Sequence, residues 1–85
     1  MTWRVEFRPS ARAELLKLDR PVQERVLRSL HRLASDPHAA ASVKALKGSD
    51  ELRLRVGDWR VVYTLRDDVL MVLVVRIAHR REVYR

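Results

Sequence analysis

Alternation between apolar and polar side chains over residues 52–65 constrains the fold of this chain more than any other feature. The apolar positions of that pattern are Leu52, Leu54, Val56, Trp59, Val61, Tyr63 and Leu65. A period of two is typical of a β-strand with one buried face. Gly57-Asp58 interrupts the pattern with a turn signal. The stretch therefore predicts two strands joined by a short turn.

Two helices are predicted ahead of these strands. Residues 3–8 alternate like a half-buried first strand. Ser10 is a suitable N-cap for a short helix that reaches about Leu18. A second helix opens at Asp19-Arg20-Pro21 and ends at Asp36-Pro37, because the residue before a proline avoids the helical region. Helices joined this closely form a helical hairpin.

The order of elements is therefore β-α-α-β-β-β, in a single domain of residues 1–85. Residues 38–47 are expected to form a loop that leads into the sheet. Residues 69–78 are apolar on both faces until Arg76, and such a strand is usually interior to its sheet. Its expected neighbours are the strand that starts at Trp59 and the first strand. The fold class is α+β, with the helical hairpin packed on one face of a small, mostly antiparallel sheet.

Charge is the informative part of the composition. The chain has 18 Lys and Arg against 11 Asp and Glu, a net charge of +7, and basic domains of this size often bind nucleic acid or an acidic partner. Without cysteine, a disulfide framework and a thiolate metal site are excluded. The longest apolar run, residues 69–75, is far too short to span a membrane. A cytoplasmic location without a membrane partner is expected, since the start, MTWRVEFRPS, lacks a leader pattern.

The strand pattern also places the arginines. If the apolar positions face the helices, Arg53 and Arg55 point to the opposite face, and Arg60 joins them there. Three guanidinium groups on one face can bind a phosphate backbone through charge-assisted hydrogen bonds. Arg76 either joins them or marks where the sheet meets solvent. The alternative for all of these arginines is a solvated face or a surface that docks a partner.

Residues 52–84, LRLRVGDWRVVYTLRDDVLMVLVVRIAHRREVY, resemble the RelE branch of the RelE/ParE toxin superfamily. The resemblance rests on the basic strand 52–56, on the WRVVY sequence at 59–63, and on the ending IAHRREVY at 77–84. The first strand, the helical hairpin and the Leu46-Lys47-Gly48 lead-in fit as well. The resemblance thus covers the whole chain as one RelE-like toxin domain with the RelE-like microbial RNase fold.

Such a resemblance implies the toxin of a type II toxin–antitoxin system. RelE-like members cut messenger RNA in the ribosomal A site without a metal or other cofactor, and thereby inhibit translation. The 2′-hydroxyl attacks the adjacent phosphate, and a 5′-hydroxyl leaves. A cognate antitoxin neutralises the toxin, and operator DNA is contacted only through the antitoxin.

The resemblance also assigns site residues. Arg60 and Arg80 match the phosphate-binding arginines of the family, and Tyr84 matches a C-terminal tyrosine that stacks on a base or transfers a proton. Arg53 and Arg55 stand where well-studied RelE members carry lysines. This departure leaves the general base unassigned, because arginine stays protonated.

His79 is the substitute for that missing group within the motif, since imidazole exchanges protons near neutral pH. The alternative is a surface histidine at a strand end. His31 and His38 are expected to be inert, because the sequence places no catalytic group beside them.

Two other functions remain open. ParE-like relatives share the fold but inhibit DNA gyrase, although the ending HRREVY argues against that reading. A catalytically degenerate toxin could persist as an antitoxin-binding or DNA-binding module, because arginine binds phosphate even where catalysis has been lost.

Overall fold

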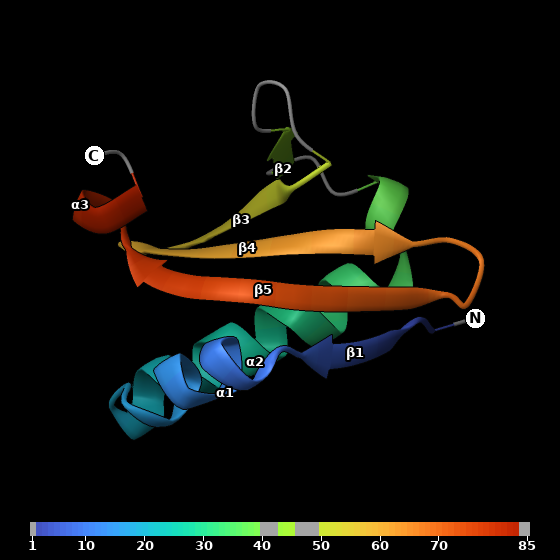
Figure 1. Ribbon diagram of the computed structural model, residues 1–85. Helices are drawn as coiled ribbons and strands as arrows, with labels where there is room; N and C mark the ends of the chain where they lie inside the picture. Colours follow the sequence, from blue (N-terminus) through green and yellow to red (C-terminus); the bar gives the residue numbers. More distant parts are fainter. Residues whose placement is uncertain (1, 40–42, 46–49, 84–85) are drawn as a thin grey trace.

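The computed structural model describes residues 2–39, 43–45 and 50–83 (Figure 1). In chain order the elements are β1 (Arg4–Phe7), α1 (Pro9–Leu16), α2 (Arg20–Ser35), the 3-10 turn η1 (Pro37–Ala39), β2 (Val43–Ala45), β3 (Leu52–Val56), β4 (Trp59–Arg66), β5 (Met71–His79) and α3 (Arg80–Val83). The predicted α+β class and its β-α-α-β-β-β core are confirmed. The short elements β2 and α3 are additions to it.

The five strands form one mixed sheet in the order β1-β5-β4-β3-β2. β1 runs parallel to β5, and the other neighbouring pairs are antiparallel. The predicted interior position of β5 is confirmed, because it lies between β1 and β4. A parallel pair needs a crossover connection, and the helical hairpin begins that connection from β1 (Figure 1).

Two sequence-based expectations about local structure are wrong. Residues 38–47 are not all loop, because Val43–Ala45 pairs with β3; three residues are too few to show a strand period. Arg8 rather than Ser10 is the N-cap of α1, and the helix ends at Leu16. Pro9 takes the first turn, where its missing N–H costs no hydrogen bond. The Leu46-Lys47-Gly48 lead-in lies outside the described residues.

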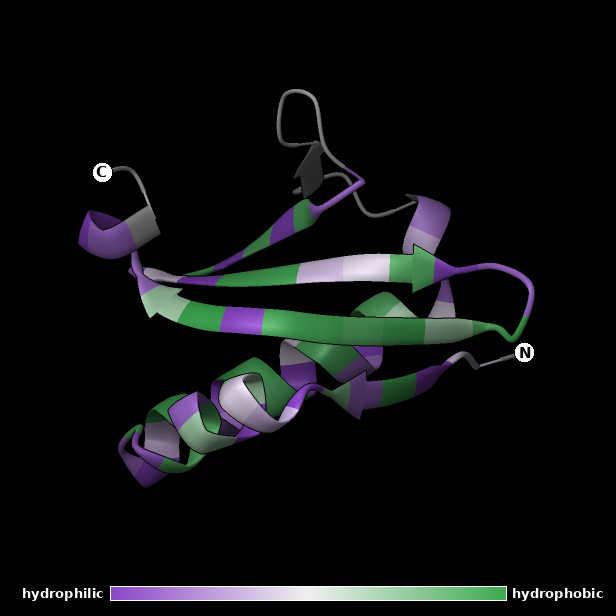
Figure 2. Cartoon of the chain, viewed as in Figure 1, coloured by the Kyte–Doolittle hydropathy of each residue, from purple (hydrophilic) through white to green (hydrophobic). Residues whose placement is uncertain are grey.

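The hydrophobic core lies between the helical hairpin and one face of the sheet. Its buried members are Ala11, Leu15, Val26, Leu30, Leu33, Ala34, Leu54, Val56, Val61, Tyr63, Val72, Val74 and Ile77. Figure 2 shows the long central strands, β4 and β5, as mainly hydrophobic, whereas β3 carries alternating bands. The predicted packing of the helices on one sheet face is confirmed. None of the described helices combines the length and apolar character needed to cross a membrane.

A β-bulge in β5 decides which side chains reach the other face. Val62 pairs with Arg76, but the next residue, Tyr63, pairs with Val74, so Val75 is an extra residue. Beyond the bulge, the side chains of β5 that would have faced the helices face the opposite side of the sheet, and the reverse. Val74 and Ile77 therefore both enter the core, and Arg76 turns away from the helices.

Beyond the bulge, one stretch of β5 lies beside α1 instead of a strand. β1 ends at Phe7, which is paired with Val74. Further along β5, the Ile77 N–H donates to Oε1 of Glu14 at 2.9 Å. A helix side chain thus satisfies a backbone group at the point where the first strand has stopped.

Candidate functional site

Four arginines on β3, β4 and β5 lie close together in the register, on the face of the sheet that points away from the helices. Arg55 lies directly opposite Arg60, and Arg53 lies opposite Val62. Val62 in turn pairs with Arg76 on its other side. The predicted placement of Arg53, Arg55 and Arg60 on one face is confirmed, and the bulge adds Arg76. We call Arg53, Arg55, Arg60 and Arg76 the arginine face.

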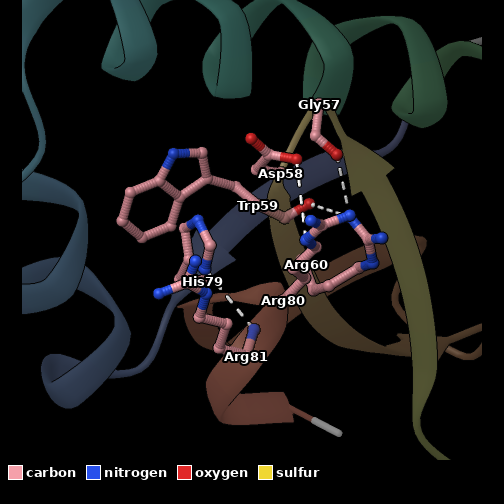
Figure 3. A network of polar contacts seen from close by, with 7 residues as sticks. All are labelled: Gly57, Asp58, Trp59, Arg60, His79, Arg80 and Arg81. Carbon is pink, nitrogen blue, oxygen red and sulfur yellow. Dashed lines mark hydrogen bonds and ion pairs between the residues drawn. The ribbon is translucent and has the colours of Figure 1, made fainter.

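Arg60 differs from an ordinary surface arginine because its side chain is buried, at 7% exposure. Its Nη1 donates to the carbonyl oxygens of Gly57 at 2.9 Å and Trp59 at 3.0 Å (Figure 3). Buried charge is tolerated when its donors are satisfied. Like charges directly opposite in a ladder destabilise the pair. The Arg55–Arg60 pairing therefore makes this face a favourable place for an anion.

The β3–β4 turn at Gly57-Asp58 accepts hydrogen bonds from both Arg60 and Arg80. Gly57 has φ of +59°, and a glycine at the first central position suits a two-residue hairpin turn. A Cβ at Gly57 would come within 3.0 Å of Nη2 of Arg25. Glycine is therefore required by the backbone angle, whereas the Arg25 guanidinium, at the far end of a flexible side chain, would need to move by only a few tenths of an ångström.

Arg80 is anchored to the same turn. It is the first residue of α3, directly after β5. Its N–H donates to the carbonyl oxygen of Asp58 at 2.8 Å, and its Nε lies 3.8 Å from Oδ1 of Asp58. Arg60 and Arg80, which are far apart in sequence, are thus held on one turn (Figure 3).

His79 is close to Arg80 but faces the other side of the sheet. It pairs in register with Trp59, which packs against the core. The two rings meet edge to face, with centroids 5.4 Å apart. His79 is therefore separated by the sheet from Arg55 and Arg60. Its Nδ1 accepts a hydrogen bond from the Arg81 N–H at 3.4 Å.

A hollow of about 520 Å³ opens where the sheet ends and α3 begins, lined by Asp58, His79, Arg80, Arg81 and Glu82. A smaller hollow of about 310 Å³ shares Glu82 and reaches Glu14 and Trp59. Glu82 also lies 3.8 Å from Nη2 of Arg76, through Oε2. The hollow therefore brings two carboxylates, a histidine and two arginines together at one end of the sheet.

Sequence reasoning missed Asp58, which it treated only as a turn residue. The available signal was an acidic residue immediately before the Trp59-Arg60 pair. Tyr84 lies outside the described residues, so its role stays a prediction. His38, which is expected to be inert, contacts one carboxylate: its Nε2 lies 2.8 Å from Oδ1 of Asp67, an exposed contact at the β4–β5 turn. Its inertness stays a prediction.

Over the part of the chain that the structure describes, no three His, Asp or Glu side chains are grouped closely enough to hold a metal ion. The side chains that line the hollow carry carboxylate, imidazole and guanidinium groups. Guanidinium groups stabilise phosphate charge, while imidazole and carboxylate groups transfer protons.

Comparison with known proteins identifies the class. Residues 5–84 match the family model for the ParE toxin of type II toxin–antitoxin systems, parDE. The chain is 31% identical over 81 residues to a RelE-like toxin protein of Escherichia coli, covering 94% of this chain and 85% of that one. The fold and site therefore define a toxin of the type II toxin–antitoxin class. Within that class, the chain belongs to the RelE/ParE family.

Solved structures agree with this assignment. The RelBE2 toxin–antitoxin complex of Mycobacterium tuberculosis contains a chain with a TM-score of 0.82 and 25% identity, covering 94% of this chain and 100% of that one. The intact RelBE complex of Escherichia coli contains another, with a TM-score of 0.77, 26% identity, and coverage of 91% and 95%. The RelE-like fold is thus shared along almost the whole chain.

Proposed function

We propose that this toxin is a ribosome-dependent messenger-RNA endonuclease that cuts in the A site and stops translation. The observation that carries the proposal is the hollow at the end of β5. Both His79 and Arg80 line it, and Arg80 is hydrogen-bonded to the same turn as Arg60 of the arginine face. Cleavage by a 2′-hydroxyl needs phosphate stabilisation and proton transfer, and these residue types supply both.

RNA binding is attributed to the arginine face. Arg55 and Arg60 are like charges directly opposite each other, and a phosphate backbone offsets their repulsion. Arg53 and Arg76 extend the positive charge to one strand on either side of β4. Such a row of arginines would bind the phosphate backbone of single-stranded RNA without recognising its base sequence.

In the hollow, Arg80 is proposed to bind the scissile phosphate and His79 to transfer a proton. Tyr84 is proposed to stack on a base or assist proton transfer, as the family resemblance implies. The buried Arg60 acts on the phosphate through its charge and also through the turn that it holds. The proposed reaction uses no metal and no other cofactor.

A cognate antitoxin is the proposed protein partner. The two solved relatives described above are toxin–antitoxin complexes. With a net charge of +7, this toxin would attract an acidic antitoxin segment, which stabilises the fold on binding. Contact with operator DNA is proposed only through that antitoxin.

ParE-like inhibition of DNA gyrase is the second candidate, favoured by the family model that matches residues 5–84. It would make the toxin a binder of a protein target and not an enzyme. Against it stands the grouping of Arg80, His79 and Asp58 in one hollow, which a binding surface does not require. A catalytically degenerate toxin would keep the arginine face for antitoxin or DNA binding.

Mapping of RNA 5′ ends after expression in cells separates these functions. The nuclease reading expects new 5′ ends within translated codons and a fall in protein synthesis. Arg80→Ala should reduce cleavage by about 100-fold or more. Arg66→Ala, which removes an exposed arginine at the far end of β4, is the matched control. Intact RNA together with inhibited supercoiling by purified gyrase would overturn the nuclease proposal in favour of the ParE-like one.

A further inference from the structure

The proposed reaction needs a proton acceptor for the 2′-hydroxyl and a proton donor for the 5′-oxygen. Among the described residues considered from sequence, only His79 can fill one of these roles. Arg53 and Arg55 remain protonated. In His79, Nδ1 accepts the Arg81 N–H at 3.4 Å. A neutral ring in that arrangement carries its hydrogen on the other nitrogen, so its lone pair is directed at the backbone of α3.

The carboxylate of Asp58 extends from the β3–β4 turn, where the backbone carbonyl groups of three consecutive residues accept hydrogen bonds. Arg60 donates to the carbonyl oxygens of Gly57 and Trp59. Between them, the carbonyl oxygen of Asp58 accepts the Arg80 N–H at 2.8 Å. Three consecutive carbonyl groups are thus fixed by the two arginines of the site. A catalytic group attached to such a backbone is well positioned before substrate arrives.

The Asp58 carboxylate itself is close to Arg80 without being hydrogen-bonded to it. Oδ1 lies 3.8 Å from Nε of Arg80, beyond hydrogen-bond length. Both side chains are more than half exposed to solvent, at 66% and 56%. The carboxylate therefore stands beside the proposed phosphate-binding group and can reach a substrate that enters the hollow.

We propose that Asp58 is the catalytic residue that accepts the proton of the RNA 2′-hydroxyl. This inference rests on the proposed nuclease function. As Asp58 takes the proton, the 2′-oxygen forms a bond to phosphorus and the bond from phosphorus to the 5′-oxygen breaks. Protonated His79 gives its proton to the departing 5′-oxygen, after releasing the Arg81 N–H. The products are a 2′,3′-cyclic phosphate and a 5′-hydroxyl, and Arg80 stabilises the charge on phosphorus.

Glu82 is the other carboxylate that lines the hollow, and its placement differs. It lies 3.8 Å from Arg76, which belongs to the arginine face, and it also borders the smaller hollow. Asp58 instead lies beside Arg80. Because Glu82 lines the same hollow, the matched control is Asp68 instead. Its Oδ1 lies 3.8 Å from Nε of Arg66 at the β4–β5 turn, so its replacement also removes one exposed negative charge beside an arginine.

The charges around Asp58 come from every neighbouring element. Arg80, Arg81 and Glu82 belong to α3, and His79 ends β5. Arg25 of α2 lies against the adjacent Gly57. Cationic groups outnumber acidic ones here, which favours the approach of a substrate phosphate to the position beside Asp58.

The test is single-turnover cleavage of messenger RNA on programmed ribosomes. Asp58→Asn should lower the rate by about 100- to 10,000-fold. Asp58→Glu, which keeps a carboxylate, should restore much of the rate. Asp68→Asn should stay within a few-fold of wild type. Thermal unfolding of each variant shows whether it is folded. If Asp58→Asn is unfolded, formate is added to Asp58→Ala to test whether a small carboxylate restores cleavage.

An electrostatic role makes the opposite prediction. If Asp58 only masks Arg80, Asp58→Asn should bind RNA more tightly and cleave at least as fast as wild type, and that result would overturn the inference. An equal loss in Asp68→Asn would also overturn the inference. If Asp58→Asn is unfolded, failure of formate to restore cleavage by Asp58→Ala would overturn it as well. Absence of cleavage by the wild-type toxin would instead overturn the proposed function, and this inference with it.

Discussion

Arg55 of β3 and Arg60 of β4 are directly opposite each other in the ladder, yet they are in different environments. Arg55 is exposed, whereas Arg60 is buried and donates to two carbonyl oxygens of the β3–β4 turn. The pair therefore combines a solvent-facing cation, which we propose binds RNA, with an internal cation that is hydrogen-bonded to the turn. Their difference allows the structural and functional effects of arginine removal to be measured side by side.

Arg60→Ala is expected to destabilise the fold by about 1–3 kcal/mol, because hydrogen bonds from a charged donor to two turn carbonyls are lost. Arg55→Ala, the exposed partner, should change stability by less than about 0.5 kcal/mol. Urea unfolding monitored by circular dichroism provides both values. Equal stability of the two variants would show that the buried arginine does not hold the turn.

Gly57→Ala is expected to cost about 1–2 kcal/mol, because φ of +59° is unfavourable for a residue with a Cβ. The new methyl group would also meet Arg25 at 3.0 Å. A double-mutant cycle with Arg25→Ala separates the two causes. The guanidinium contact should contribute only a part of the loss, so that Gly57→Ala remains destabilising when Arg25 is absent. Full recovery in the double variant would contradict a backbone origin.

Tyr63→Phe is expected to leave stability at neutral pH unchanged or to raise it by up to about 1 kcal/mol. The Tyr63 hydroxyl is buried without a hydrogen-bond partner in the described part of the chain, and such a group costs desolvation free energy. A clear loss of stability on removing the hydroxyl would mean that it does have a partner.

Burial raises the pKa of Tyr63 from 10.0 to about 12, which predicts a pH dependence. Between these values the unfolded chain releases the phenolic proton while the folded chain retains it. Stability therefore falls as pH rises through this window, by at most about 1.4 kcal/mol per pH unit. Tyr63→Phe should remove that contribution. Urea midpoints of both proteins at rising pH measure it, and parallel curves would contradict the assignment.

Salt dependence tests the arginine face. Each of Arg53→Ala and Arg76→Ala should weaken binding to single-stranded RNA and lower the slope of log K against log salt by about 0.7. Arg66→Ala, at the far end of β4, should lower it less. Fluorescence anisotropy with one labelled oligonucleotide over a salt series gives these slopes. Identical effects at all three positions would mean that binding reflects net charge alone.

Local patterns in the sequence were sufficient to predict most of the elements. The apolar positions from Leu52 to Leu65 specified two strands, and Gly57-Asp58 specified the turn between them. Proline at positions 21 and 37 delimited the second helix. These features depend on residues within a few positions of each other, where backbone geometry fixes the period. The shared face of Arg53, Arg55 and Arg60 follows from the same period.

The tertiary structure alone decided how these elements are combined in a site. The extra residue Val75 turned Arg76 onto the arginine face, and pairing with Trp59 placed His79 on the opposite one. Contacts between Asp58 and Arg80 assembled the hollow at the end of the sheet. Strand register and bulges depend on residues far apart in the chain, and a single extra residue reverses every side chain that follows. The sequence therefore determined which side chains are available, and long-range pairing determined which of them meet.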